Sequence, residues 1–368
     1  MSVSARKPGV VVVGRKFGTR AHVPALRAAG FEVLALVGRD LNKTQYRAGQ
    51  LGIPHACRSL EEALRIPGVD AVTIAAPPLV HAELTQEALA AGRHVICEKP
   101  FTVTVPEARR LHELAKQAGV VHMVGHEFRW NPARAAIGAA VAEGRIGTTR
   151  LFTVVNYEPL LTDPLIGTMP AWFHQEGSGG GWIGAVGCHA FDQVFAWLGP
   201  YESVSASGVI AQDRMQGPED SFLVRARMRC GAEGVIQGSG AAWAELAFTS
   251  VSGTRGTLSI EGADHWTGST WMSDAEGRRA VDPPSERESF SRIPGAATAW
   301  QQFAHLEIWH YTRLCEAFRK AIEGAAPDPA VPLPTFADGL ASMQVIDAIR
   351  RSVAASGAVT PVLDSGTA

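Results

Sequence analysis

The sequence has few cysteines and no excess of either charge. Five cysteines occur among 368 residues, and no two of them form a C-x-x-C pair. This spacing indicates neither a zinc site nor a disulfide framework, so we expect no bound metal. Lysine and arginine total 34 against 36 acidic residues, a formal charge of −2. Proteins that bind a nucleic-acid backbone need a basic surface, so we expect no nucleic-acid partner.

Long apolar runs are also absent. The first residues lack the apolar stretch of a secretion signal, and no run elsewhere is long enough to span a bilayer. We therefore expect a cytoplasmic protein with no membrane partner. Hydrophobic residues make up 46% of the chain and charged residues 19%, as in ordinary globular enzymes. A chain of 368 residues favours two domains.

Up to residue 124, short apolar runs alternate with helical stretches. Unbroken apolar runs indicate strands that are buried on both faces of a parallel sheet. The runs are Val10–Val13, Val33–Val37, Ala71–Ala75, His94–Cys97 and Val120–Val124. The helical stretches between them end at glycines, which is typical of helix termini. This repetition predicts an α/β chain whose residues 1–124 form a doubly wound Rossmann sheet, with ligands beyond the carboxyl ends of the strands.

Residues 125–368 show a different pattern. Apolar residues alternate with Leu223 and three arginines over Phe222–Arg229, which predicts a half-buried strand. Further strands are expected at Leu151–Tyr157, Val204–Ala211, Gly234–Ser239, Leu246–Ser252 and Gly256–Ile260, helices at Cys188–Leu198, Ala299–Glu323 and Phe336–Ala355, and an exposed loop at Asp274–Ser291. This predicts a C-terminal α/β domain with a large, mostly antiparallel open-faced sheet. Its bare face needs a partner, so we expect a homodimer or homotetramer.

A glycine turn follows the first strand, in the segment Val10–His22 (VVVVGRKFGTRAH). A strand, a glycine turn and a helix start together form the phosphate-binding element of a dinucleotide domain. We expect Gly14, Lys16, Phe17 and Gly18 to contact the cofactor there. Lys16 stands where the usual pattern has a second glycine, so it either pairs with a phosphate or obstructs the turn. An ordinary tight turn is the alternative interpretation.

The second strand ends in Gly38-Arg39-Asp40. An acidic residue about 20 positions beyond the glycines binds a ribose hydroxyl of NAD, whereas an arginine suits the 2′-phosphate of NADP. Arg39 lies nearer the strand end than Asp40 does, which favours NADP over NAD, with Lys43 as support. The alternative is that Arg39 is a solvated loop charge.

Two further motifs follow buried strands, Ala75–His81 (AAPPLVH) and Ala91–Pro100 (AGRHVICEKP). Both therefore lie at the ligand-binding edge of the predicted sheet. A lysine at such an edge is costly to bury unless it is used, and it suits proton transfer. Pro100 can lock the backbone after Lys99, and a cis bond between the two residues is one way to do so. The alternative is that Glu98 and Lys99 are exposed loop charges.

These motifs, together with Gly179–Asp192 (GGGWIGAVGCHAFD) and Phe336–Ser352, resemble the Gfo/Idh/MocA oxidoreductase family over nearly the whole chain. The resemblance implies a Rossmann domain followed by an open-faced α/β domain that binds substrate and mediates oligomerisation. It implies that Lys99 is the catalytic lysine and His189 the active-site histidine. The residues that it places in the cofactor pocket are Pro77, Pro78, His81, Glu98 and Lys99.

One position departs from the family pattern. The family commonly has an aspartate four residues before the histidine, where this chain has Ala185. Residues four apart on a helix share a face and suit an acid/base pair. Asp192 and Glu127 are the candidates to replace the missing carboxylate. Their alternatives are a helix-surface acid for Asp192 and a salt-bridge partner of Arg129 for Glu127.

Trp172 and Trp182 flank the glycine run before His189. They either line the substrate pocket with His189 or belong to the core or an interface, which is the commoner role of such aromatics. If they face the pocket, the substrate is flatter and more apolar than a free sugar.

The predicted function is an NAD(P)-dependent dehydrogenase or reductase that transfers a hydride between nicotinamide and a carbinol carbon. The resemblance implies a small-molecule substrate such as a sugar, a cyclitol or a related cyclic polyol or diol. One alternative is a redox-neutral lyase or glycosidase that uses bound NAD(P) for transient oxidation. Another is a non-catalytic dinucleotide-binding subunit, which Lys16 and Ala185 would suit.

Overall fold

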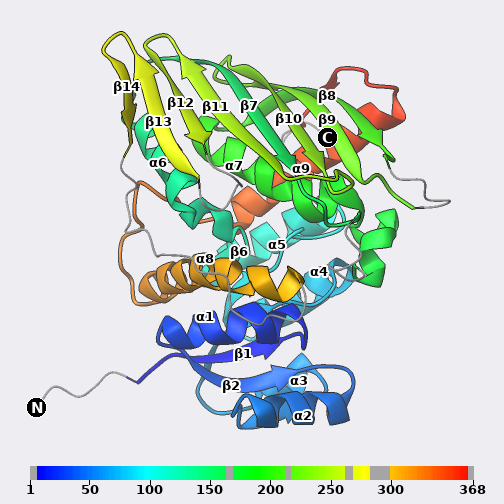
Figure 1. Ribbon diagram of the computed structural model, residues 1–368. Coiled ribbons are helices and arrows are strands. Elements are labelled where there is room, and N and C mark those ends of the chain that lie inside the picture. Colours follow the sequence, from blue (N-terminus) through cyan, green and yellow to red (C-terminus); the bar gives the residue numbers. More distant parts are fainter. Residues whose placement is uncertain (1–5, 163–168, 212–216, 262–267, 282–298, 364–368) are drawn as a thin grey trace, which may run out of the picture.

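The structure is a computed structural model that describes residues 6–162, 169–211, 217–261, 268–281 and 299–363. Within 299–307 only the backbone is described. The model divides into a parallel sheet near the N-terminus and a larger sheet formed by later residues, with helices between the two (Figure 1).

The first sheet has six parallel strands in the order β3-β2-β1-β4-β5-β6. The strands are β1 (Gly9–Val13), β2 (Glu32–Val37), β3 (His55–Cys57), β4 (Val69–Ile74), β5 (His94–Cys97) and β6 (His122–Val124). Valine and isoleucine dominate these strands, and every residue of β1 is buried, as expected for strands covered on both faces. The prediction of a doubly wound Rossmann sheet is confirmed.

Helices connect these strands: α1 (Val23–Ala28), α2 (Leu41–Gln50), α3 (Leu60–Leu64), α4 (His81–Ala90) and α5 (Val105–Ala118). Local sequence sets the ends of α5. The Thr104 hydroxyl accepts from the Glu107 amide while the Glu107 carboxylate accepts from the Thr104 amide, and Gly119 ends the helix at φ 62°. Thr104 and Glu107 thus fix where the helix begins, and Gly119 fixes where it ends.

The second sheet has nine strands in the order β14-β13-β12-β11-β7-β10-β9-β8-β15. They are β7 (Thr149–Tyr157), β8 (Tyr201–Val209), β9 (Ser221–Met228), β10 (Glu233–Ser239), β11 (Leu246–Gly253), β12 (Gly256–Glu261), β13 (Ser269–Asp274), β14 (Gly277–Ala280) and β15 (Thr360–Pro361). All pairs are antiparallel except β7 with β10, which confirms the predicted mostly antiparallel sheet. The loop expected from Asp274 is wrong up to residue 280, because β14 forms a hairpin with β13. Residues 282–291 of that expected loop lie outside the described residues.

Helices α6 (Pro132–Ala142), α7 (Cys188–Leu198) and α9 (Phe336–Ala354) lie on one side of this sheet (Figure 1). The described residues place no helix on its other side, in agreement with the predicted open face. Helix α8 (Ala299–Ile322) packs instead against the first sheet's helices, where Phe318 stacks on Phe31 at 5.9 Å. The later part of the chain therefore also covers part of the Rossmann layer.

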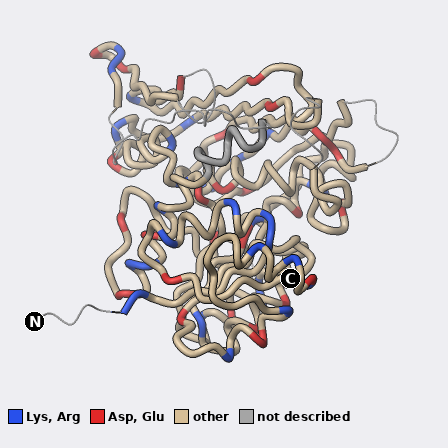
Figure 2. Tube along the Cα trace, turned by 60° about the horizontal axis from the view of Figure 1, so that its bottom comes forward, with Lys and Arg blue, Asp and Glu red and all other residues tan. Residues whose placement is uncertain are grey.

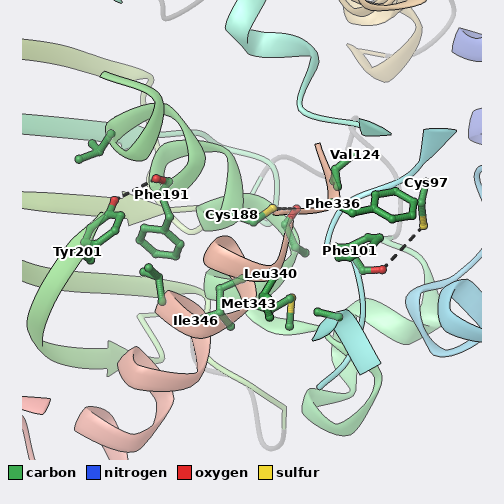
Figure 3. Close-up of a cluster of buried hydrophobic side chains, with 14 of the residues drawn as sticks. Cys97, Phe101, Val124, Cys188, Phe191, Tyr201, Phe336, Leu340, Met343 and Ile346 are labelled. Carbon is green, nitrogen blue, oxygen red and sulfur yellow. Dashed lines mark hydrogen bonds between the residues drawn. The ribbon is translucent and has the colours of Figure 1, made fainter. Parts of the chain in front are cut away.

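One buried core continues from the first sheet into the second (Figure 3). Cys97 and Phe101 lie at the Rossmann end of this core, where the Phe101 ring packs on Phe336 at 4.5 Å. Phe191 and Tyr201 lie at its other end. Because Cys97 and Phe101 are both buried, the segment between them is held at both ends. That segment is Glu98-Lys99-Pro100.

Lysine and arginine residues are interspersed with acidic residues along the Cα trace (Figure 2). Among the described helices, none combines the length and apolar character that crossing a membrane requires. In the same part of the chain, no group of three or more histidine, cysteine or acidic side chains is arranged to hold a metal ion.

Candidate active site between the two sheets

The turn after β1 approaches the neighbouring strand closely. Gly14 has φ +119°, and a Cβ there would lie 2.3 Å from the Ala75 carbonyl oxygen, so only glycine fits. At Gly18 the chain enters the helical turn Gly18–His22 that leads into α1. Lys16 is exposed, and its carbonyl accepts from the Thr19 and Arg20 amides. The turn forms with Lys16 in place, and this tight backbone fits the pyrophosphate of a dinucleotide.

The end of β2 gathers three basic side chains. The Asp40 carboxylate accepts from the Lys43 amide at 3.2 Å and pairs with Lys43 Nζ at 3.0 Å, so it caps α2. These contacts lower the pKa of Asp40. Arg39 is exposed, and Arg15 crosses Gly38 so closely that a Cβ there would lie 2.8 Å from its Cδ. Lys43 and Arg15 therefore act electrostatically on Asp40, and Arg39 precedes it in the chain.

The segment after β4 places Pro77 at the surface and buries Pro78 and His81. His81 Nε2 lies 2.8 Å from the Ala76 carbonyl oxygen, and Nδ1 lies 3.0 Å from that of Pro100. Burial lowers the pKa of His81. His81 thus ties the ends of β4 and β5 together through backbone oxygens, and its ring has no nitrogen left for a ligand.

Glu98 lies beneath the site. His22 Nε2 is 3.0 Å from Glu98 Oε1, and both side chains are almost fully buried. The Tyr311 ring of α8 packs on His22 at 4.5 Å, and Phe17 meets both rings at their edges. Sequence reasoning assigned no role to His22 or Tyr311. Here they hold Glu98 in place next to Lys99.

Lys99 reaches from the end of β5 to the second domain. Its Nζ donates to the Ala185 carbonyl oxygen at 3.1 Å, across 86 residues of sequence. The Cys188 thiol lies 3.8 Å from the same oxygen, and burial raises its pKa to about 12. The bond from Lys99 to Pro100 is cis, which confirms the isomer considered for it. The interpretation of Lys99 as an exposed loop charge is wrong.

The glycine run before α7 packs on the Rossmann edge. Gly179 has φ +79°, and a Cβ there would lie 3.3 Å from Pro78 and 3.4 Å from Pro100. Four residues after Ala185, His189 lies in the first turn of α7 and is partly exposed. The Phe128 ring packs on His189 at 4.3 Å. The structure thus brings together Lys99, His189 and the glycine run, which are distant in sequence.

Comparison with known proteins agrees with this geometry. Residues 9–126 match the family model for an oxidoreductase family with an NAD-binding Rossmann fold, and residues 135–259 match that of the GFO/IDH/MocA C-terminal domain. A 1,5-anhydro-D-fructose reductase of Ensifer adhaerens is 32% identical over 244 residues, 64% of this chain and 70% of that protein. This chain belongs to the Gfo/Idh/MocA family.

Two further proteins are similar to this chain, one over part of its sequence and one in its fold alone. An uncharacterized oxidoreductase of Synechocystis sp. is 35% identical over 58% of this chain and 57% of its own, so the match spans little more than half of that relative. A levoglucosan dehydrogenase solved with NADH and levoglucosan superposes with a TM-score of 0.80. At 22% identity, over 97% of this chain and 100% of that one, it shows the fold alone.

The structure corrects the expectation that Asp192 replaces the family's missing aspartate. Arg129 donates to both Asp192 oxygens, at 2.8 and 2.5 Å, and also to Asp338 at 2.8 Å. Burial raises the pKa of Asp192, but the Arg129 charge outweighs burial and leaves the pKa below its usual value. Asp192 is 3% exposed, so it is not a helix-surface acid either. It is a structural ion-pair partner.

Two other predicted residues of this Gfo/Idh/MocA protein are buried. Glu127 is 3% exposed on the turn Glu127–Trp130, and Arg129 of the same turn forms ion pairs with Asp192 and Asp338. Trp182 is 1% exposed, and its ring occupies the space that a Cβ on Gly240 would enter. The structure places Trp182 in the core. Trp172 is partly buried against that core.

Two charged residues near Lys99 carried no signal in the sequence. Arg134 lies in the first turn of α6, with its guanidinium 5.0 Å from the centre of the Phe128 ring. Glu158 directly follows β7 and accepts from Asn156 Nδ2 at 2.8 Å. Arg134 stands in an unpredicted helix, and Glu158 follows an ordinary strand. The alternation of side-chain directions along β7, which predicts the face on which Glu158 lies, was the one signal available in the sequence.

Proposed function

We propose that this protein is an NAD(P)-dependent dehydrogenase or reductase that acts on a CH–OH group of a sugar, cyclitol or related cyclic polyol or diol. The contact between Lys99 Nζ and the Ala185 carbonyl carries the proposal. It brings a lysine at the ligand-binding edge of the Rossmann sheet against the segment that leads to His189. A small molecule held between the two sheets would meet both side chains.

Each group in the site has a chemical part. A nicotinamide, when bound, would supply the hydride chemistry at the carbinol carbon. Lys99 exchanges the hydroxyl proton and stabilises the negative charge that develops on the oxygen. His189 orients that hydroxyl, and Phe128 holds the His189 ring by packing on it. Residues that would hold the cofactor are Gly14, Lys16, Phe17, Gly18, Arg39, Pro77 and Pro78, with Glu98 and His81 supporting the edge from below.

The names of two similar proteins support the substrate class. One is a reductase of 1,5-anhydro-D-fructose and the other a dehydrogenase of levoglucosan, both of which are cyclic sugar derivatives. A panel of sugars, anhydrosugars, cyclitols and cyclic diols, each with NAD and with NADP, tests the proposal by the absorbance of the reduced cofactor. Products formed without net reduction would favour a lyase or glycosidase. Tight cofactor binding without turnover would favour a non-catalytic subunit.

We also propose that NADP is preferred. Asp40 is committed to capping α2, and Arg15, Arg39 and Lys43 are the cations at this end of β2 that a ribose 2′-phosphate would meet there. We expect Arg39→Ala to lower kcat/KM with NADP by about 10- to 100-fold, since a hydrogen bond to a charged group contributes about 1.5–3 kcal/mol. The value with NAD should change little. Steady-state kinetics with both cofactors measures this difference.

Arg145→Ala is the matched control, because Arg145 is an exposed arginine paired with Glu143 at the end of α6. It should leave both cofactor constants unchanged. A wild-type preference for NAD, or equal losses with both cofactors in Arg39→Ala, would contradict the proposed preference.

We propose that the open face of the nine-stranded sheet joins two copies of the chain. Five apolar side chains on its central strands are 45–61% exposed: Leu151, Leu223, Val235, Leu246 and Phe248. We call these residues the sheet-face patch. They come from the adjacent strands β9, β10, β7 and β11. Contiguous exposed apolar surface of this kind marks interaction sites, and a two-fold axis would pair the patch with itself.

Val235→Glu is therefore expected to shift the protein from dimer or tetramer towards monomer. The reason is that two copies of the new carboxylate would be buried in one apolar interface. Sedimentation velocity at several concentrations measures the shift. Tyr46→Glu, at a site that is 70% exposed on α2, is the control and should keep the assembly. A monomeric wild type, or an unchanged Val235→Glu, would refute the role of the patch.

A further inference from the structure

The alternating side-chain directions of β7 point Glu158 towards the site. Phe152 is buried on the face that the helices cover, while Leu151 is exposed on the other face. Successive side chains of a strand alternate between faces, so Asn156 and Glu158 continue the Phe152 side. The Glu158 amide donates to the Ser239 carbonyl at 2.8 Å, which extends the β7–β10 pairing through this residue. Glu158 is thus held by the strand pairing directly after the end of β7, and it faces the helices.

Contacts link Glu158 to the residues already described. Asn156 Nδ2 donates to Glu158 Oε1 at 2.8 Å. Arg134 of α6 and Lys99 of the Rossmann edge both act on Glu158 electrostatically, and so does Glu245, which precedes β11. Arg134 lies over the Phe128 ring, which packs on His189. We call Lys99, Phe128, Arg134, Glu158 and His189 the Lys99 cluster.

Other carboxylates are worse placed to serve Lys99. Position 185 has only a methyl side chain, and its carbonyl accepts from Lys99 Nζ. Asp192 has both oxygens bound by Arg129. Glu98 faces His22 and accepts from the Lys99 amide. Glu158 differs from these acids because the surrounding protein leaves it partly exposed.

We infer that Glu158 supplies the carboxylate that is missing at position 185 and is the final acceptor of the substrate's hydroxyl proton. This inference rests on the proposed dehydrogenase function. During oxidation the substrate O–H bond breaks, and its proton goes to Lys99 while Lys99 passes another proton to Glu158. The two electrons of the C–H bond leave with the hydride to the bound nicotinamide, and a C=O bond forms. Lys99 keeps its charge, and Glu158 ends protonated.

The titration of Glu158 suits this task. Burial raises the pKa of Glu158 to about 7, and the Glu245 charge also raises it. The hydrogen bond from Asn156 and the charges of Arg134 and Lys99 act in the opposite direction. A general base works best when its pKa lies near the operating pH. Burial lowers the pKa of Arg134 to about 10, while the nearby charges of Glu127 and Glu158 raise it.

Glu158→Gln tests the inference by kinetics. In the wild type, kcat/KM for oxidation should rise with pH to a plateau above about pH 7, because Glu158 must be ionised to accept the proton. In Glu158→Gln the plateau should fall by about 100-fold or more, and this rise should disappear. Glu158→Asp should restore the pH-dependent rise in part, since it keeps the carboxylate.

Glu261→Gln is the matched control, because Glu261 is an exposed acid of the same sheet that pairs with Arg278. It should match the wild type in rate and pH profile. Retention of the rise near pH 7 in Glu158→Gln, or a rate close to wild type, would overturn the inference while leaving the dehydrogenase function intact.

A second measurement needs no turnover. The folded protein holds a proton on Glu158 up to about pH 7, whereas the unfolded chain releases it near 4.5. Ionisation of Glu158 therefore opposes folding increasingly from about pH 4.5 to 7. The melting temperature of Glu158→Gln should rise relative to wild type over that range, and Glu261→Gln should show no such trend. Parallel pH dependence in all three proteins would overturn the inference, even if no substrate were oxidised.

Discussion

Replacing Lys99 with alanine is expected to lower kcat by about 100- to 10,000-fold, the usual contribution of a positioned acid or base. Lys99 is the proposed proton-exchanging group, and its Nζ is placed by the Ala185 carbonyl at 3.1 Å. Truncation removes the ammonium without disturbing Cys97 or Phe101, which are buried on either side. Turnover of the best substrate, measured by cofactor absorbance, gives the loss.

Cofactor binding distinguishes lost chemistry from lost structure. The dissociation constant of the cofactor, measured by fluorescence, should change much less than kcat, because the glycine turn after β1 is untouched. Lys116→Ala, at an exposed lysine in the last turn of α5, is the matched control and should keep full activity. If Lys99→Ala kept near-full turnover, the assignment of Lys99 would be wrong.

Arg129→Met is expected to destabilise the fold by about 3–5 kcal/mol, the typical cost of leaving a buried charge unpaired. Arg129 and Asp192 are each 3% exposed. Arg129 also donates to Asp338 and to the Pro332 carbonyl, so it joins the turn Glu127–Trp130 to α7 and α9. Without it, the buried carboxylate of Asp192 loses the cation that pairs with it. Urea unfolding measures the loss, and activity should fall as well because Phe128 on that turn supports His189.

A double variant separates the buried charge from the lost packing. Arg129→Met combined with Asp192→Leu removes both charges and should recover part of the stability. Arg145→Ala breaks an exposed pair and should cost less than about 1 kcal/mol. A single Arg129→Met variant as stable as wild type would show that the Arg129 ion pairs do not hold these elements together.

The Rossmann sheet was predictable because its signals are local. Apolar runs such as Val10–Val13 and glycines at helix ends depend on neighbouring residues only, and the helix predicted at Cys188–Leu198 has the same bounds in the structure. The division into domains at residue 124 stays a prediction. Helix α6 was missed, although Asn131 caps it and Pro132 begins it. Its alanine-rich sequence shows little apolar periodicity, which is the signal that identifies a helix.

The candidate site divides in the same way. The sequence by itself determined that Lys99 lies at a ligand-binding edge, because a residue that follows a parallel strand must lie there. It also determined that position 185 lacks a carboxylate. Only the tertiary structure decided that Lys99 donates to the Ala185 carbonyl, that Arg129 pairs with Asp192, and that Lys99 acts electrostatically on Glu158. These interactions join residues 59–86 positions apart, and they depend on the packing between two sheets, which no local pattern encodes.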